Sequence, residues 1–417
     1  MQLSILARQT RCMPSLQQVI LFLVYAAIAV YGLHYHTATP LIHAASFLSL
    51  IYLIKQKYLN TKPLNRISQL WLACLIIWPS VYIIAYFIEP GYVSKKIAVN
   101  LIQSTLLVAP IFLALRSFKI TKKPIIFASL LSLLGSIISS IFNYFTNHAA
   151  EPIYLSTGSI NISIVFGNII AMQIAICLVF ILNTKKTKPA LQVILYTITL
   201  LGVLSLGLTG SRGAMAAIIL PLSIFFVLLF IKLKRKVIFS AATTLGVCIT
   251  TPFLIASPVF QKSLLKFTDI SLLGIFGERL YIWRAALEKI ANHPWAGYGV
   301  GKDKQAIAEY AYKNNLAEQH ATYGHIHNDI LQSIFSFGLP IGILLCFLLY
   351  SPALTAIHTL YKKHKEYIAL TPVFICLSFF VSGLTDSAAL QAPSMKFYCL
   401  TISLFLALHY QKKCHKH

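Results

Sequence analysis

Residues 323–342 read YGHIHNDILQSIFSFGLPIG, where two histidines, an asparagine and an aspartate directly precede an apolar run. Asn328 or Asp329 would cap the helix that this run predicts, because short polar side chains accept hydrogen bonds from the first free N–H groups of a helix. Capping leaves His325 and His327 unexplained. The positive end of the helix dipole disfavours imidazolium, so a histidine here stays available as a base near neutral pH. The cluster is therefore a candidate proton-transfer site, and the simpler interpretation is a pair of packing or surface histidines.

Arg212 in LTGSRGAMAAI is the only charged residue of a short turn at the start of another predicted helix. Thr209 and Ser211 are candidate caps of that helix. The free N–H groups of a helix start favour an anion, and a guanidinium beside them adds paired donors for a phosphate. The simpler interpretation is an interfacial arginine whose side chain reaches to water.

The segment GERLYIWRAALEKI predicts an amphipathic helix with Arg279 and Arg284 on opposite flanks of one apolar stripe. The stripe consists of Leu280, Trp283, Leu287 and Ile290. Such a helix would rest on a membrane surface, where both arginines lie at the depth of lipid phosphates. An interfacial helix with ordinary charged edges is the alternative. The GYGVG that follows lacks the strand and the spacing of a nucleotide loop, so we expect a turn there and no nucleotide partner.

Asp386, in GLTDSAALQAPSMKF, is the last acidic residue of the chain. It would orient a histidine or an arginine, or cap a helix. The sequence has no Cys or His spacing typical of metal ligands, so the expected site uses no metal and no cofactor.

The elements that must position these residues are membrane helices. Of the 417 residues, 57% are hydrophobic and 11% charged, and the mean hydropathy is +0.74, which is far too apolar for a soluble protein. Because a span needs about 20 apolar residues, the sequence predicts an all-α polytopic membrane protein with about twelve transmembrane helices. They are expected near 17–34, 38–54, 67–88, 97–115, 124–144, 158–183, 190–208, 212–231, 237–257, 328–350, 367–384 and 389–410.

Charge predicts how these spans are oriented. Most of the 35 Lys and Arg residues fall at the termini and in alternate loops, and of the 11 Asp and Glu residues only Glu366 lies on that face. Basic residues of short loops stay in the cytoplasm, so we expect both termini there. The net charge of +24 then reflects topology and attraction to anionic membrane lipid, and predicts no nucleic-acid partner.

Three regions follow from this topology. Residues 1–257 would form helices one to nine, and residues 258–327 one large loop on the outer face, with the amphipathic helix; the resemblance described next makes this a periplasmic loop. Residues 328–417 would form helices ten to twelve and a cytoplasmic tail.

Four motifs in this order resemble the O-antigen ligase family of lipopolysaccharide assembly, within a larger superfamily of ligases and polymerases. They are TGSRGAMA, GERLYIWRAALEKIANHPWAGYGVG, HIHNDILQSIFSFGLPIG and SGLTD. One departure is visible, because Gly338 and Gly342 replace the closer glycine pair that the family often has after its H–N element. We expect these glycines to serve helix packing or a bend. The resemblance implies a fold like that of C-type membrane glycosyltransferases.

The resemblance also implies an activity on the periplasmic face of the bacterial inner membrane. It is the metal-independent, inverting transfer of a polysaccharide from undecaprenyl diphosphate to a sugar hydroxyl of lipid A-core. By position, His327 is the expected base with His325 as helper or substitute. The diphosphate would be bound by Arg212, Arg279 and Arg284, and Asn328, Asp329 and Asp386 would support the site.

Three other functions compete with this one. An O-antigen polymerase or an oligosaccharyltransferase that modifies protein hydroxyls would use the same lipid-linked donor. A secondary transporter is a more distant alternative, because the expected spans hold few ionisable groups, of which His43 is the main one. A structural membrane scaffold would leave the shared face of Arg212, Arg279 and His327 as a coincidence.

Overall fold

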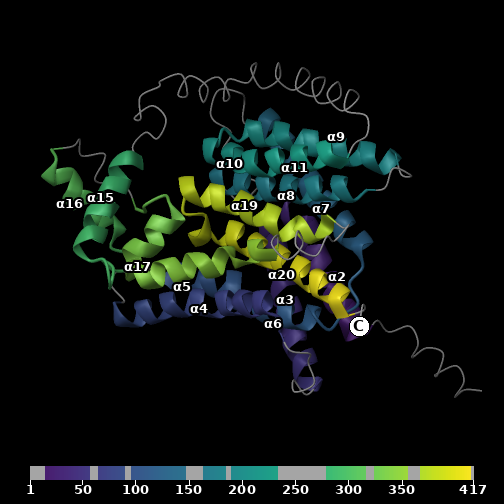
Figure 1. Ribbon diagram of the computed structural model, residues 1–417, viewed down its shortest axis with the longest axis horizontal. Coiled ribbons are helices and arrows are strands. Elements are labelled where there is room, and N and C mark those ends of the chain that lie inside the picture. The colour runs from purple at the N-terminus through teal and green to yellow at the C-terminus, as the bar shows by residue number, and fades with distance from the viewer. Residues whose placement is uncertain are drawn as a thin grey trace, which may run out of the picture.

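The computed structural model of the chain describes residues 15–56, 64–89, 95–146, 163–184, 189–232, 279–315, 324–355 and 367–414. Within these ranges all regular structure is helical (Figure 1). The helices of the first part are α2 (Leu16–Tyr31), α3 (Tyr35–Lys55), α4 (Arg66–Ile88), α5 (Lys95–Leu101), the π-helix η3 (Ile102–Leu106), α6 (Val108–Leu115), α7 (Lys122–Thr146), α8 (Ser163–Asn183), α9 (Pro189–Leu208), α10 (Arg212–Ala217) and α11 (Ile219–Lys232). Those of the second part are α15 (Arg279–Asn292), α16 (Asp303–Lys313), α17 (Asp329–Tyr350), η5 (Ser351–Leu354), η6 (Tyr367–Leu370), α19 (Thr371–Thr385), η7 (Ala388–Leu390) and α20 (Ala392–Cys414).

Nine helical segments of the described ranges are long and apolar enough to cross a membrane. Each coincides with an expected span, and α5, η3 and α6 together form one of them. The shorter α2 and the Lys396-containing α20 match the first and last expected spans. The span expected at 237–257 lies outside the described residues. The chain is therefore an all-α multi-pass membrane protein, and the number of twelve spans stays a prediction.

Helix α8 lies at the centre of the bundle. In its segment Ile164–Asn183, 94% of the apolar window is buried, and α8 contacts α7, α9, α10, α11, α19 and α20. A Cβ atom on Gly167 of α8 would lie 2.7 Å from Cβ of Ala214 in α10, so glycine permits the close approach of these two helices. The packing fixes where α10 begins, and Arg212 is its first residue.

Helix α17 is broken in its middle. Gly338 has φ 79° and ψ 171°, which is a non-helical conformation. The break removes the Phe335 carbonyl and the Leu339 N–H from the helical ladder, and segment 294–298 supplies their partners. Tyr298 donates its backbone N–H to the Phe335 carbonyl at 2.7 Å, and Leu339 donates to the Pro294 carbonyl at 2.7 Å. The bend expected from the glycines is confirmed, and it attaches the residues that follow α15 to a span.

Replacing Gly338 by alanine is expected to destabilise the protein by about 1–3 kcal/mol, because its backbone conformation is almost exclusive to glycine. An added Cβ would also lie 2.2 Å from the Trp295 carbonyl oxygen. Thermal unfolding in detergent measures the effect. Gly324→Ala is the matched control, since a Cβ there meets nothing within 4 Å. Equal melting temperatures of the two variants would contradict the role of the break.

Helix α15 packs against protein, and this corrects the expected apolar stripe. Its buried residues are Ile282, Ala285 and Ala286, while Leu287 of the predicted stripe is 52% exposed. Trp283 and Ile290 are partly buried against the same cluster. The buried face of α15 differs from the predicted stripe because α16 and the first half of α17 cover it. The small side chains of Ala285 and Ala286 let those helices approach closely. Figure 1 shows α15 and α16 together at one end of the bundle, next to α17.

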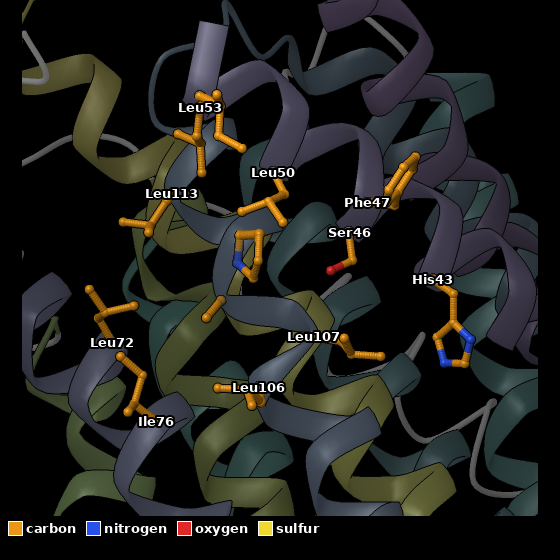
Figure 2. A pocket seen from close by; sticks show the side chains of 13 residues that line it. His43, Ser46, Phe47, Leu50, Leu53, Leu72, Ile76, Leu106, Leu107 and Leu113 are labelled. Carbon is orange, nitrogen blue, oxygen red and sulfur yellow. The ribbon is translucent and has the colours of Figure 1, made fainter. Parts of the chain in front are cut away.

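An apolar groove of about 850 Å³ lies between α3, α4, η3 and α6 (Figure 2). Its apolar walls include Phe47, Leu50, Leu72, Ile76, Leu106 and Leu113. His43 and Ser46 are its polar members, and Nε2 of His43 is buried without a hydrogen-bond partner among the described residues. Such a lining gives water few partners, so the groove suits hydrocarbon chains.

Candidate functional site

His327 and Asp386 form the centre of the site. His327 lies in the turn before α17, and its Nδ1 is 2.9 Å from Oδ1 of Asp386, the residue that follows α19. From the sequence, Asp386 was expected to orient a histidine or an arginine, or to cap a helix. In the structure its side chain contacts a histidine. Since the carboxylate accepts a hydrogen bond from Nδ1–H, the neutral imidazole presents its lone pair at Nε2. The pair therefore has the geometry of an oriented general base.

Asp386 is buried and held in its ionised form by donors. Burial alone would raise the pKa of Asp386, but hydrogen bonds from His327, Gln391 and the Ser387 backbone hold that pKa below its ordinary value. Nε2 of Gln391 donates to the second carboxylate oxygen. Gln391 was not among the sequence candidates, because an amide in a loop gives no chemical signal until its partner is known.

His325 lies beside His327, with 4.8 Å between the ring centroids and 53° between the ring planes. Burial lowers the pKa of His325, and the neighbouring charge of His327 lowers it further. His327 itself has a positive φ of 53°, which is uncommon for a residue other than glycine and marks a constrained position. A second imidazole therefore lies close to the oriented one.

Asn328 caps α17, and Asp329 does not. The Asn328 side-chain oxygen accepts hydrogen bonds from the backbone N–H groups of Ile330 and Leu331, both at 3.0 Å. Its amide also donates to the Leu384 carbonyl at 3.1 Å, which brings the end of α19 against the start of α17. Asp329 instead accepts from the Ala389 N–H at 3.0 Å and so holds the loop that follows Asp386.

Arg212 reaches this centre through the packing of α10 on α19. Ser211 is the N-cap of α10 and accepts from the Ala214 N–H at 3.3 Å, as the sequence predicted. A Cβ on Gly213 would lie 2.2 Å from Oγ1 of Thr385. Because Thr385 immediately precedes Asp386, the start of α10 lies close to Asp386.

Arg279, the first residue of α15, belongs to the same group of charges. Burial lowers the pKa of Arg279, the charge of Asp386 raises it and the charge of Arg212 lowers it. Arg279 therefore lies close enough to both Asp386 and Arg212 for its charge to interact with theirs. Arg284 lies five residues further along α15 and is exposed, and the described contacts of the group do not include it.

Replacing Asp386 by asparagine keeps the shape of the side chain and removes its charge. A carboxylate with a lowered pKa stabilises the fold above the unfolded pKa of about 4, and this contribution is lost as pH falls through the folded pKa. We expect Asp386→Asn to lower stability by about 1–3 kcal/mol at neutral pH, and the difference from wild type to shrink as the pH is lowered. Thermal unfolding over a pH series measures both effects. A constant difference at every pH would contradict the role of the charge.

The helices and this group of residues define a multi-pass membrane protein with a histidine–carboxylate pair and two arginines where its helices begin and end. The model of the family described as O-antigen ligase matches residues 197–347. The match covers Arg212, Arg279, His325 and His327, and it supports the resemblance of the first three motifs, while SGLTD at 382–386 lies beyond it. This segment is thus similar to the O-antigen ligase family, and the similarity indicates a glycosyl-transferring enzyme. No curated protein matches the chain.

Proposed function

We propose that this protein is an O-antigen ligase of the bacterial inner membrane. It transfers a polysaccharide from undecaprenyl diphosphate to a sugar hydroxyl of lipid A-core on the periplasmic face. The observation that supports this most strongly is the oriented pair of His327 and Asp386 beside Arg212 and Arg279, because it combines a base with cations that suit a diphosphate.

The reaction is a single displacement. The acceptor hydroxyl oxygen attacks the anomeric carbon of the donor and gives its proton to Nε2 of His327. The bond between that carbon and the diphosphate oxygen breaks, and its electron pair leaves with undecaprenyl diphosphate. The anomeric centre is inverted.

Each residue then has one task. Asp386 orients His327 and favours the imidazolium that forms. Arg212 and Arg279 stabilise the negative charge that grows on the leaving diphosphate. The reaction in this scheme needs no metal ion. His325 is the helper of His327, and Asn328 and Asp329 hold the two loops together. Arg284 remains a predicted donor contact.

The donor chemistry is shared with the polymerase and with the protein-directed transferase, so the acceptor decides among them. Vesicles that contain the purified protein and labelled lipid-linked O-antigen are offered lipid A-core, lipid-linked repeat units or a pilin-like protein. We expect label on lipid A-core. Label only in longer lipid-linked chains would make the protein a polymerase, label only on the protein acceptor would make it an oligosaccharyltransferase, and no transfer to any acceptor would refute glycosyl transfer.

A further inference from the structure

The turn that carries both histidines is held at the residue between them. Ile326 is 1% exposed and packs among Ile282, Ala306 and Phe335 of α15, α16 and α17. His327 contacts Asp386, which lies outside this cluster, at 2.9 Å, and the ring of His325 lies beside that of His327. The buried Ile326 therefore anchors the turn between the two histidines.

Both backbone groups of Ile326 are bonded to side chains. Its N–H donates to Oε1 of Gln332 at 3.2 Å, and its carbonyl accepts from Nε1 of Trp283 at 3.1 Å. Gln332 in turn donates through Nε2 to Oδ1 of Asp303 at 2.6 Å. These four residues, Asp303, Gln332, Ile326 and Trp283, are called the Ile326 relay below. The relay links α16, α17 and α15 to one peptide unit on each side of Ile326.

The chemistry of the relay sets the direction of each bond. Asp303 is 7% exposed and Gln332 is 3% exposed, so neither side chain can easily exchange its partner for water. An ionised carboxylate only accepts hydrogen bonds, so the amide nitrogen of Gln332 must face Asp303. The amide oxygen must then face Ile326, where an N–H needs an acceptor.

We propose that Asp303 and Gln332 are positioning residues of the transfer reaction, which hold Ile326 and thereby fix His327 against Asp386. This inference rests on the proposed function. A positive φ at His327 persists only where the surrounding structure enforces it, and the relay enforces it from the residue before. The relay acts on the reaction only through the turn that carries His327, so its loss is expected to lower the turnover number and to leave substrate binding unchanged.

The test moves the carboxylate from residue 303 to residue 332, the two ends of the hydrogen bond between Asp303 and Gln332. Gln332→Glu removes the amide donor to Asp303 and places two buried carboxylates in contact, which weakens the link to α16 most at pH values where both are ionised. Asp303→Asn combined with Gln332→Glu restores it, because the amide introduced at position 303 donates to the new carboxylate, which still accepts from Ile326. The full-length variants are assayed in vesicles with the labelled donor and lipid A-core. For Gln332→Glu we expect kcat to fall by about tenfold or more with KM unchanged, and for the double variant we expect recovery to within about threefold of wild type.

A second readout does not depend on transfer activity. A histidine-acylating reagent followed by mass spectrometry gives the modification rates of His325 and His327, which should rise in Gln332→Glu and return in the double variant. Trp283→Phe keeps an aromatic side chain, although a smaller one, and removes the donor to Ile326, so it should raise the same rates if Gln332→Glu does not fold. Unchanged rates and kcat in the folded variants, or no rescue by the double variant, would overturn the relay. Inactive wild-type protein with the expected acylation pattern would refute the proposed function and leave the relay standing.

Discussion

Replacing His327 by alanine is expected to lower the rate of polysaccharide transfer by about 10²–10⁴-fold, the usual contribution of a general base. The reason is the contact between its Nδ1 and Asp386 at 2.9 Å, which presents Nε2 to the acceptor hydroxyl. The measurement is single-turnover transfer of labelled O-antigen to lipid A-core in vesicles. Binding of the donor should change little, because the base acts on the acceptor.

Two further variants make this result specific. His327→Asn retains a side chain that tolerates the positive φ of this position, so a loss of rate there is not a backbone effect. His293→Ala is the matched control, since His293 is exposed after α15 and lies outside the proposed site. Wild-type rates in both His327 variants would remove the proposed base, and a comparable loss in His293→Ala would show that the assay reports folding.

Replacing Arg279 by alanine is expected to lower the transfer rate by about 10²–10³-fold, as for other groups that stabilise charge in a transition state. Arg279 shares its electrostatic environment with Arg212 and Asp386, so Arg212→Ala should have a similar effect. The two losses should be less than additive, because each arginine stabilises the same diphosphate. Arg279→Lys should recover only part of the rate, since lysine lacks the paired donors of a guanidinium.

The control removes a positive charge from the neighbouring helix α16. Lys304→Ala removes an exposed cation from α16 and should transfer at the wild-type rate. Arg284→Ala then tests whether Arg284, the third arginine predicted to bind the donor, contacts the diphosphate. A loss near that of Arg279→Ala would place Arg284 on the diphosphate, and an unchanged rate would exclude it. If Lys304→Ala were as slow as Arg279→Ala, general surface charge would explain the effect and the specific site would not.

Helix caps and the bend in α17 could be predicted from the sequence because they depend on residues that are neighbours in the chain. Ser211 and Asn328 cap the helices that follow them, as short polar side chains before apolar runs do. The glycines at 338 and 342 were expected to serve a bend or packing, and Gly338 does form the bend. The class of the protein followed in the same way from the length and hydropathy of its apolar runs.

The partners of these features depend on packing between distant segments and could not be predicted. Asp329 was a candidate cap, yet it binds the backbone of Ala389, sixty residues away. The buried face of α15 differs from the predicted stripe because the covering surface is α16 and α17. Gln391 and Gln332 carry no charge and no motif, so only their contacts identify them.

The break in α17 also imposes an order on biogenesis. Inside a bilayer an unpaired N–H or C=O costs several kcal/mol, so interrupted helices need partners from elsewhere in the chain. For Phe335 and Leu339 those partners are Tyr298 and Pro294, which the ribosome has already synthesised when this span emerges. The nascent span therefore completes its hydrogen bonds only when residues 294–298 have already reached their place beside it. A delay in placing that segment would leave a membrane helix with two unpaired backbone groups, and such a chain is a natural substrate for membrane quality control.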